Sequence, residues 1–152
     1  MNNYKLISKQ GLHVEYLSFG NGAKTLLCFH GFGREAKDFL PFNQTIGELY
    51  TIHSVNLFYH GKSNFPNNRL ENKPLTPKEL TLILELIKVN ENFDRFSIAG
   101  YSLGGKIALG LAEVFYENLD ELFLIAPDGI KANPWYYFAS QTLIGQKLNK
   151  WV

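Results

Sequence analysis

The sequence predicts an α/β fold, in which helices cover both faces of a mostly parallel sheet that is preceded by an antiparallel hairpin. Along the 152 residues, short apolar runs with the period of strands alternate with helical stretches, and this alternation is typical of parallel sheets. The first two strand-like runs are joined around Gln10-Gly11, which indicates the hairpin. A hydrophobic content of 45%, with 14% aromatic residues, excludes a disordered chain.

The first part of the chain contains four predicted strands and one predicted helix. Residues 4–8 and 13–19 form the hairpin, and 24–29 is the first fully buried strand. Residues 39–49 are predicted to be helical and 50–57 to form the next strand. In a sheet of this kind, function is expected at the carboxyl ends of the strands.

The second part opens with a strong helix start. Thr76 is the predicted N-cap, Pro77 takes the first helical position and Glu79 closes a capping box. The helix then carries one apolar stripe, which is a core face rather than a ligand site: Leu80, Ile83, Leu84 and Ile87. Two further strands and one helix are predicted over 95–99, 122–126 and 105–116.

The segment Gly100-Tyr101-Ser102-Leu103-Gly104 carries the most specific chemical signal. It has the pattern Gly-x-Ser-x-Gly and lies between a predicted strand and a predicted helix, which is the context of a nucleophile elbow. Such a turn strains the backbone of the serine, and side chains at Gly100 and Gly104 would crowd that residue. The start of the helix also directs backbone N–H groups and the positive end of its dipole at an oxyanion. Ser102 is therefore the predicted catalytic nucleophile.

A glycine-flanked loop supplies the second part of the predicted site. The strand over 24–29 runs directly into His30-Gly31-Phe32-Gly33. The backbone N–H groups of Phe32 and Leu103 are the predicted oxyanion hole, a role that does not depend on their side chains. His30 either hydrogen-bonds backbone to hold its loop or acts as the catalytic base, and the first interpretation is favoured.

Three motifs together resemble the α/β-hydrolase fold superfamily in their order and spacing: His30-Gly31-Phe32-Gly33, Asn56-Leu57-Phe58-Tyr59-His60-Gly61-Lys62-Ser63 and Gly100-Tyr101-Ser102-Leu103-Gly104-Gly105. The resemblance implies a serine hydrolase that acts on a carboxyl ester or a similar acyl compound, without a cofactor or a metal. It also implies that His30, Gly31 and His60 organise loops. His60 is the alternative base if the base comes from this sequence.

The middle motif departs from the family pattern D-x-x-G-H-G-x-S at two positions. Asn56 stands where aspartate is common, and Tyr59 replaces the first glycine. The residues His60, Gly61 and Ser63 match the pattern.

The resemblance covers almost the whole chain but only the first half or so of the family pattern, in which an acid and a histidine follow the nucleophile. All four histidines precede Ser102. We therefore expect the chain to be the amino-terminal portion of a hydrolase that lacks the acid and the histidine of the triad. Asp128 is the only later acidic residue that follows a predicted strand, and Pro127-Asp128-Gly129 is either a turn, as favoured, or the position of the acid.

Two regions are predicted: residues 1–132 are part of the hydrolase core, and 133–152 begin a lid. The lid segment contains Trp135, Tyr137 and Phe138, which either line an apolar substrate site or pack the lid onto the core. Without the rest of the fold, these aromatic side chains and the edge of the last strand would be exposed. Self-association through these surfaces is therefore expected.

Charge and composition limit the partners. A net charge of +1 offers no electrostatic footprint for nucleic acid or an anionic membrane, so the expected partner is a small-molecule acyl substrate.

The sequence start lacks the apolar region of a signal peptide, and no apolar run reaches the roughly 18 residues of a membrane span. The single cysteine, Cys28, is expected to be a small core residue and fits a reducing compartment. The predicted location is cytoplasmic.

Two other functions fit the same residues. Lyases and carbon–carbon bond hydrolases of this fold use the same elbow, and Gly-Tyr-Ser-Leu-Gly-Gly does not separate them from esterases. A non-catalytic binding module would keep the elbow without the triad, and the lack of a histidine after Ser102 favours that alternative directly.

Overall fold

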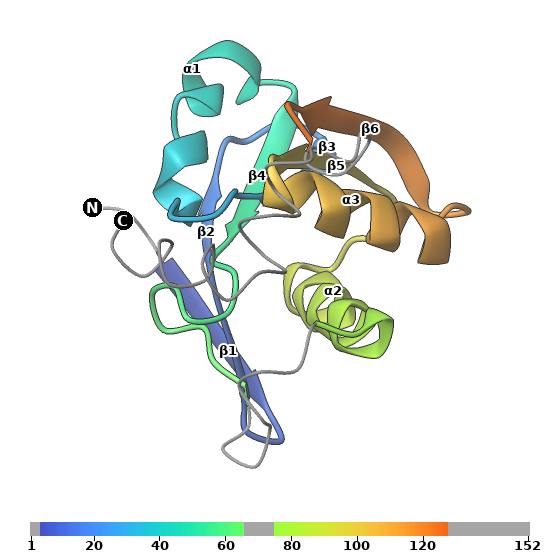
Figure 1. Cartoon of the computed structure of the whole chain (residues 1–152). Coiled ribbons are helices and arrows are strands. Elements are labelled where there is room, and N and C mark those ends of the chain that lie inside the picture. The colour runs from blue at the N-terminus through green and yellow to red at the C-terminus, as the bar shows by residue number, and fades with distance from the viewer. Residues whose placement is uncertain (1–3, 66–74, 128–152) are drawn as a thin grey trace, which may run out of the picture.

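The computed structural model describes residues 4–65 and 75–127, which form one mixed sheet with helices on both sides (Figure 1). The strands of this sheet are β1 (Tyr4–Lys9), β2 (Leu12–Phe19), β3 (Lys24–Phe29), β4 (Tyr50–Val55), β5 (Phe96–Tyr101) and β6 (Leu119–Ile125). The helical segments are the 3-10 helix η1 (Ala36–Phe39) and the α-helices α1 (Phe42–Ile46), α2 (Pro77–Glu91) and α3 (Leu103–Val114).

The strands lie in the order β1-β2-β4-β3-β5-β6. β1 and β2 pair antiparallel, as do β2 and β4, whereas β4, β3, β5 and β6 are parallel. The predicted hairpin and the predicted parallel sheet are therefore confirmed. The chain adds β4 on one side of β3 and later adds β5 on the other side. The carboxyl end of β3 thus lies where the strand order reverses, which is where open α/β sheets bind ligands.

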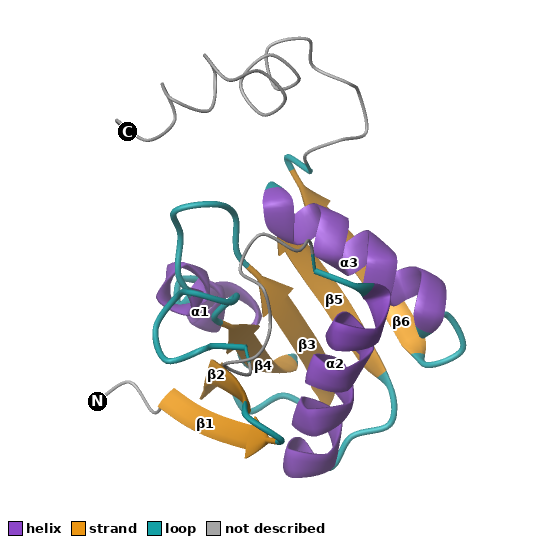
Figure 2. Cartoon of the chain, turned by 60° about the horizontal axis from the view of Figure 1, so that its bottom comes forward, coloured by secondary structure: helices purple, strands orange, loops and turns teal. Residues whose placement is uncertain are grey.

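The helices cover both faces of the sheet, as predicted. Figure 2 shows α2 and α3 lying together over one face, where they pack in one core cluster with Leu27 and Phe29 of β3. On the opposite face, Phe39 of η1 packs in a second cluster with Leu26 and Cys28. Because successive residues of β3 belong to different clusters, this strand is buried on both faces.

The start of α2 matches the sequence prediction. The N–H of Glu79 donates to Thr76 Oγ1 at 3.3 Å, and the N–H of Thr76 donates to a carboxylate oxygen of Glu79 at 2.8 Å. Pro77 takes the first helical position. The predicted stripe lies in or against the core: Leu80, Ile83, Leu84 and Ile87.

The predicted helix over 39–49 is wrong in extent. η1 ends at Phe39, and a separate helix, α1, begins after Pro41 and ends before Gly47. Proline has no N–H for a continuous helical ladder and its ring clashes with the preceding turn, so the helix restarts at this point. The strand predicted over 50–57 also ends early, at Val55, and Leu57 donates its N–H to the ring of His30 instead of to a strand.

Two compositional predictions can be compared with the structure. Cys28 is fully buried, and burial raises the pKa of its thiol, so it is a core residue as expected. Within residues 4–65 and 75–127, no helix is both long enough and apolar enough to cross a membrane. The cytoplasmic location stays a prediction.

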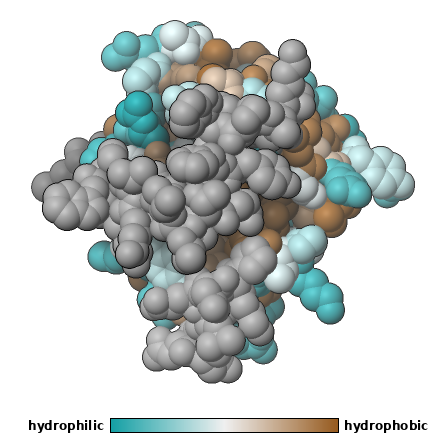
Figure 3. All heavy atoms as spheres, viewed as in Figure 1, coloured by the Kyte–Doolittle hydropathy of each residue, from teal (hydrophilic) through white to brown (hydrophobic). Residues whose placement is uncertain are grey.

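β6 is an edge strand of the described sheet and has apolar side chains at the surface. Phe123 and Ile125 are 41% and 38% exposed. Figure 3 shows apolar side chains, in brown, on the side of the molecule where Figure 1 places β6 and α3. An unpaired edge with exposed apolar groups favours pairing with another chain. Self-association through this edge stays a prediction.

A buried polar cluster joins β2, β4 and the end of α2. His53 is 2% exposed, and its Nδ1 lies 2.9 Å from Ser18 Oγ and 4.0 Å from a carboxylate oxygen of Glu91. Burial lowers the pKa of His53 to about 4. The negative charge of Glu91 raises this pKa, and the positive charge of Lys5 lowers it further. His53 is therefore neutral in the folded protein at pH 5 to 7.

This histidine makes the stability of the fold depend on pH. An unfolded histidine binds a proton near pH 6.5, but folded His53 binds one only near pH 4, so unfolding takes up a proton between these values. The contribution of His53 to the free energy of unfolding should therefore fall by about 2 to 3 kcal/mol between pH 7 and 4.5. Urea denaturation at both pH values should show a smaller loss in His53→Gln than in the wild type. The exposed His13→Gln variant is the control, and the same pH dependence in all three proteins would contradict the assignment.

Candidate active site

Ser102 lies in a sharp turn between β5 and α3, as the sequence predicts. β5 ends at Tyr101 and α3 begins at Leu103. Ser102 has a φ of 51° and a ψ of −115°, a conformation that residues other than glycine rarely adopt. Its N–H donates to the carbonyl of Ile125 at 3.0 Å. The neighbouring strand β6 thus holds the turn in place.

The glycines of the elbow are required by backbone contacts, rather than by the contact with Ser102 that the sequence suggests. A Cβ on Gly104 would lie 1.9 Å from the carbonyl oxygen of Phe29, at the end of β3. A Cβ on Gly100 would lie 2.4 Å from the carbonyl oxygen of Gly104. The first turn of α3 therefore packs directly against the backbone of β3 and β5.

The loop after β3 lies against the elbow. Phe29 and Gly100 are partners in the β3–β5 ladder, so the two segments leave the sheet side by side. A Cβ on Gly31 would lie 3.1 Å from the Cβ of Ser102 and 3.0 Å from Cδ1 of Tyr101. The lack of a side chain at Gly31 allows the loop to approach Ser102 closely.

His30 is buried, and both of its ring nitrogens are engaged. Nε2 accepts the N–H of Leu57 at 2.9 Å, so Nδ1 carries the proton and donates to the carbonyl of Gly31 at 2.8 Å. Burial lowers the pKa of His30, against the opposite effect of the hydrogen bond to Gly31. His30 is thus a neutral side chain that connects its loop to the segment after β4. This arrangement supports loop organisation rather than the alternative role as base.

The hydrogen bond from His30 also fixes the direction of the peptide that joins Gly31 to Phe32. This peptide is trans, so its C=O and N–H groups point in opposite directions. Since the carbonyl points to His30, the N–H of Phe32 points away from it. The N–H of Leu103 belongs to the first turn of α3 and has no partner inside the helix. Within residues 4–65 and 75–127 neither N–H donates a hydrogen bond. The oxyanion hole formed by these two groups stays a prediction.

His60 lies beside His30. The two ring centroids are 4.8 Å apart in an edge-to-face arrangement, and His60 Nδ1 lies 3.1 Å from the carbonyl oxygen of Phe58. These contacts place His60 in the packing between the two loops, which supports its expected role in loop organisation.

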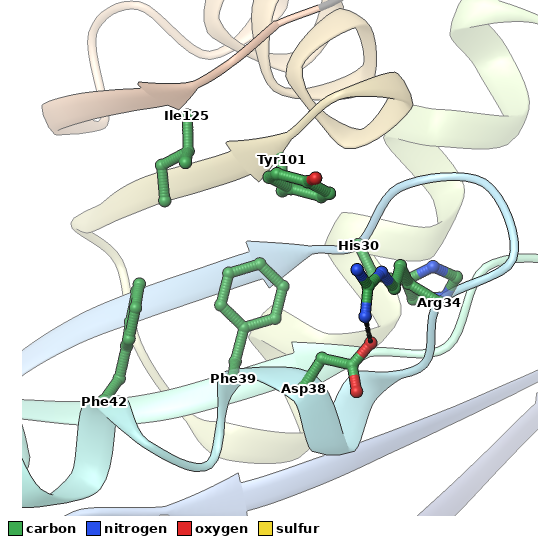
Figure 4. A pocket seen from close by; sticks show the side chains of 7 residues that line it. All are labelled: His30, Arg34, Asp38, Phe39, Phe42, Tyr101 and Ile125. Atoms are coloured by element: carbon green, nitrogen blue, oxygen red, sulfur yellow. Dashed lines mark ion pairs between the residues drawn. The ribbon is translucent and has the colours of Figure 1, made fainter.

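A cavity of about 320 Å³ opens beside the elbow. Seven residues line it: His30, Arg34, Asp38, Phe39, Phe42, Tyr101 and Ile125. Figure 4 shows the aromatic and aliphatic side chains around a common space, with the ion pair of Arg34 and Asp38, 3.9 Å apart, to one side. The cavity adjoins Ser102 through Tyr101, its neighbour in the chain, and through Ile125, its hydrogen-bond partner.

Solved structures match the fold of the chain, although no protein-family model matches its sequence. An epoxide hydrolase of the α/β-hydrolase superfamily, from metagenomes of hot environments, matches 99% of this chain with a TM-score of 0.77 and 18% identity. Carboxylesterase CesB (YbfK) from Bacillus subtilis matches 93% with a TM-score of 0.76 and 16% identity. The chain has the α/β-hydrolase fold. It spans 55% and 49% of these two proteins, respectively.

Among curated sequences, one relative comes from Cupriavidus necator. It is the dihydrolipoyllysine-residue acetyltransferase component of an acetoin cleaving system, and it is 26% identical over 126 residues. The match covers 83% of this chain and 32% of that protein. The chain thus spans about a third of this relative and about half of the solved α/β-hydrolase structures. Such partial matches assign neither an activity nor a substrate.

The structure gives a reason for one of the two departures from the α/β-hydrolase pattern after β4, Asn56, and none for tyrosine at position 59. Tyr59 has a φ of 65°, a left-handed conformation that glycine, the usual residue, adopts without strain. Asn56 Nδ2 donates to a carboxylate oxygen of Glu15 at 2.7 Å, whereas an aspartate here would bring two carboxylates together. The sequence does not single out Glu15, whose only signal is a charge in a largely apolar strand.

Several predicted features lie outside the described residues. They are Asp128, the boundary at residue 132 and the lid segment 133–152 with its substrate-lining candidates, Trp135, Tyr137 and Phe138. The part of the α/β-hydrolase fold that the structure describes has no group of three or more His, Cys, Asp or Glu side chains placed to hold a metal ion.

The contact between α3 and β3 can be tested by Gly104→Ala. The added methyl group would overlap the Phe29 carbonyl, so we expect a loss of about 3 kcal/mol or more in the free energy of unfolding. Gly110→Ala is the matched control in the same helix, because its Cβ would meet only Leu80 Cδ1 at 3.7 Å. That variant should be unchanged or about 0.5 to 1 kcal/mol more stable. Urea denaturation followed by circular dichroism measures both, and similar losses in both variants would contradict the assignment.

Proposed function

We propose that the protein is a serine hydrolase that acts on a carboxyl ester or a similar acyl compound, with Ser102 as the nucleophile. The observation that carries this proposal is the left-handed turn at Ser102, with a φ of 51° at the start of α3. A turn of this kind is strained, and strain of this kind clusters at functional sites. It also belongs to the strand–turn–helix context of a nucleophile elbow.

In the proposed reaction, Ser102 Oγ attacks the carbonyl carbon of the substrate and the carbonyl oxygen becomes an oxyanion. The N–H groups of Phe32 and Leu103 donate to this oxyanion. Each such donor contributes about 3 kcal/mol to the stability of the transition state. The positive end of the α3 dipole adds to the same effect. Both donors belong to the backbone, so the reaction does not depend on the exposed side chain of Phe32.

The general base and its acid partner are proposed to come from outside the 152 residues. Both ring nitrogens of His30 are already engaged, and His60 packs against His30. The solved structures of the same fold are about twice as long as this chain. A histidine from the additional sequence would take the proton of Ser102 Oγ and later return it to the leaving group.

The cavity beside the elbow supports a substrate with an apolar acyl group. Most of its lining is aromatic or aliphatic, and its two charged side chains form an ion pair with each other. An uncharged, apolar acyl chain matches a lining of this kind. The proposed partner is a small-molecule acyl substrate, and the net charge of +1 does not favour a nucleic acid or an anionic membrane.

Two other functions are compatible with the same structure. A lyase or carbon–carbon bond hydrolase would use the same elbow on another substrate, and profiling with esters and with carbon–carbon substrates separates these activities. A binding module without catalysis is favoured by one observation, the lack of a histidine after Ser102 in the sequence.

Self-association through the β6 edge is proposed for the chain alone.

Covalent labelling with a fluorophosphonate probe tests the proposed nucleophile. A protein extended through the sequence encoded after Val152 should be labelled, and its Ser102→Ala variant should not be. The 152-residue chain alone should react at least about a thousandfold more slowly, because only the oxyanion hole and binding remain without the base.

Other labelling patterns would overturn parts of this assignment. Undiminished labelling of Ser102→Ala would exclude Ser102 as the nucleophile. No labelling of either length would exclude the hydrolase and favour a binding module. Rapid labelling of the 152-residue chain would place the base within it and make His60 the first candidate.

A further inference from the structure

Glu15 is a buried carboxylate that the proposed reaction does not use. It lies in β2 and is 7% exposed. One of its carboxylate oxygens accepts the side-chain amide of Asn56 at 2.7 Å and the backbone N–H of Lys62 at 3.0 Å. Its own N–H donates to Ser63 Oγ at 2.8 Å, and its carbonyl accepts the N–H of Asn56 at 2.9 Å. Glu15 thus binds both ends of the segment 56–63.

Asn56 connects this contact to the loop over residues 30–36. Its Oδ1 accepts the N–H of Ala36 at 2.8 Å, at one end of the loop. At the other end, the N–H of Leu57 donates to His30 Nε2 at 2.9 Å. Two consecutive residues after β4 therefore hold the whole loop, and one of them is bound by the buried carboxylate.

Gly61 shows how closely the segment fits around this carboxylate. Its φ is 55°, and a Cβ at this position would lie 1.9 Å from Glu15 Oε2 and 2.5 Å from Asn56 Nδ2. No side chain can be added here without displacing both groups. In such close packing, a shift of the carboxylate also shifts the backbone around it.

We propose that Glu15 is a positioning residue, which acts through Asn56 to set the loop 30–36 and therefore the N–H of Phe32. This inference rests on the proposed function. An oxyanion donor is effective only at hydrogen-bond distance from the developing charge, so a small displacement of the loop weakens it. The loss should fall on the chemical step rather than on binding, since Glu15 does not line the cavity beside the elbow.

Two variants remove different parts of this contact. Glu15→Ala leaves the buried amide of Asn56 and the partly buried N–H of Lys62 without their acceptor. Glu15→Gln keeps an oxygen acceptor of similar size but removes the charge that strengthens both hydrogen bonds. In the protein extended beyond Val152, we expect kcat for p-nitrophenyl acetate to fall by about tenfold or more in Glu15→Ala and by about threefold in Glu15→Gln. KM should stay within about twofold in both variants.

Glu91→Gln is the matched control. Glu91 is also a largely buried carboxylate, with an 11% exposed side chain that accepts hydrogen bonds from Lys5 and Tyr16. It lies at the end of α2 rather than beside the loop 30–36. Both glutamine variants should lower the melting temperature, but only Glu15→Gln should lower kcat. Unchanged kcat in Glu15→Gln, or an equal fall in Glu91→Gln, would overturn the proposal.

Amide hydrogen exchange separates this inference from the proposed function. If the positioning role is correct, protection in residues 30–36 falls in Glu15→Gln and is kept in Glu91→Gln, and it does so whether or not the protein is an esterase. A wild-type extended protein that neither reacts with the fluorophosphonate probe nor hydrolyses p-nitrophenyl acetate would exclude the proposed hydrolase. Unchanged protection of residues 30–36 in Glu15→Gln would exclude the positioning role, whatever the activity.

Discussion

The close approach of α3 to β3 is the constraint on which the candidate site depends. Gly104 brings the first turn of the helix so near the Phe29 carbonyl that a Cβ would lie 1.9 Å from its oxygen. Since α3 begins directly after Ser102, this contact sets the turn and the direction of the helix N-terminus. β3 itself runs directly into His30 and Gly31, which begin the loop that forms the other part of the site. A single contact between backbones thus brings both parts of the site together.

Side-chain hydrogen bonds connect the loops at this end of the sheet, in addition to backbone bonds such as the bridge between His13 and Asn64. His30 binds Leu57, Asn56 binds Ala36, and Glu15 binds Asn56. Each is a short hydrogen bond to a buried group, and a buried donor without its partner is costly. This makes the relative position of the loops well defined. An oxyanion hole gains from such order, because its donors then need no rearrangement during the reaction.

Features encoded within a few residues could be predicted from the sequence, and features that join distant segments could not. The turn at Ser102 and the capping box of Thr76 depend on spacings of three or four residues. The division of the helix at Pro41 is also local, but hydrophobic periodicity alone does not show it. The steric reason for Gly104 lies in β3, and the contact of Glu15 with Asn56 spans 41 residues. Neither has a signature in the local sequence.

The substitution at Asn56 can be understood only together with Glu15. The family pattern commonly has a carboxylate at this position, and here an amide stands there while a carboxylate reaches the same place from β2. An aspartate at 56 would put two negative groups at the 2.7 Å that now separates an amide nitrogen from a carboxylate oxygen, which is repulsive in a buried setting. The amide instead donates to Glu15 and accepts from Ala36. In this chain the buried carboxylate beside the loop therefore comes from β2, and residue 56 contributes an amide that binds it.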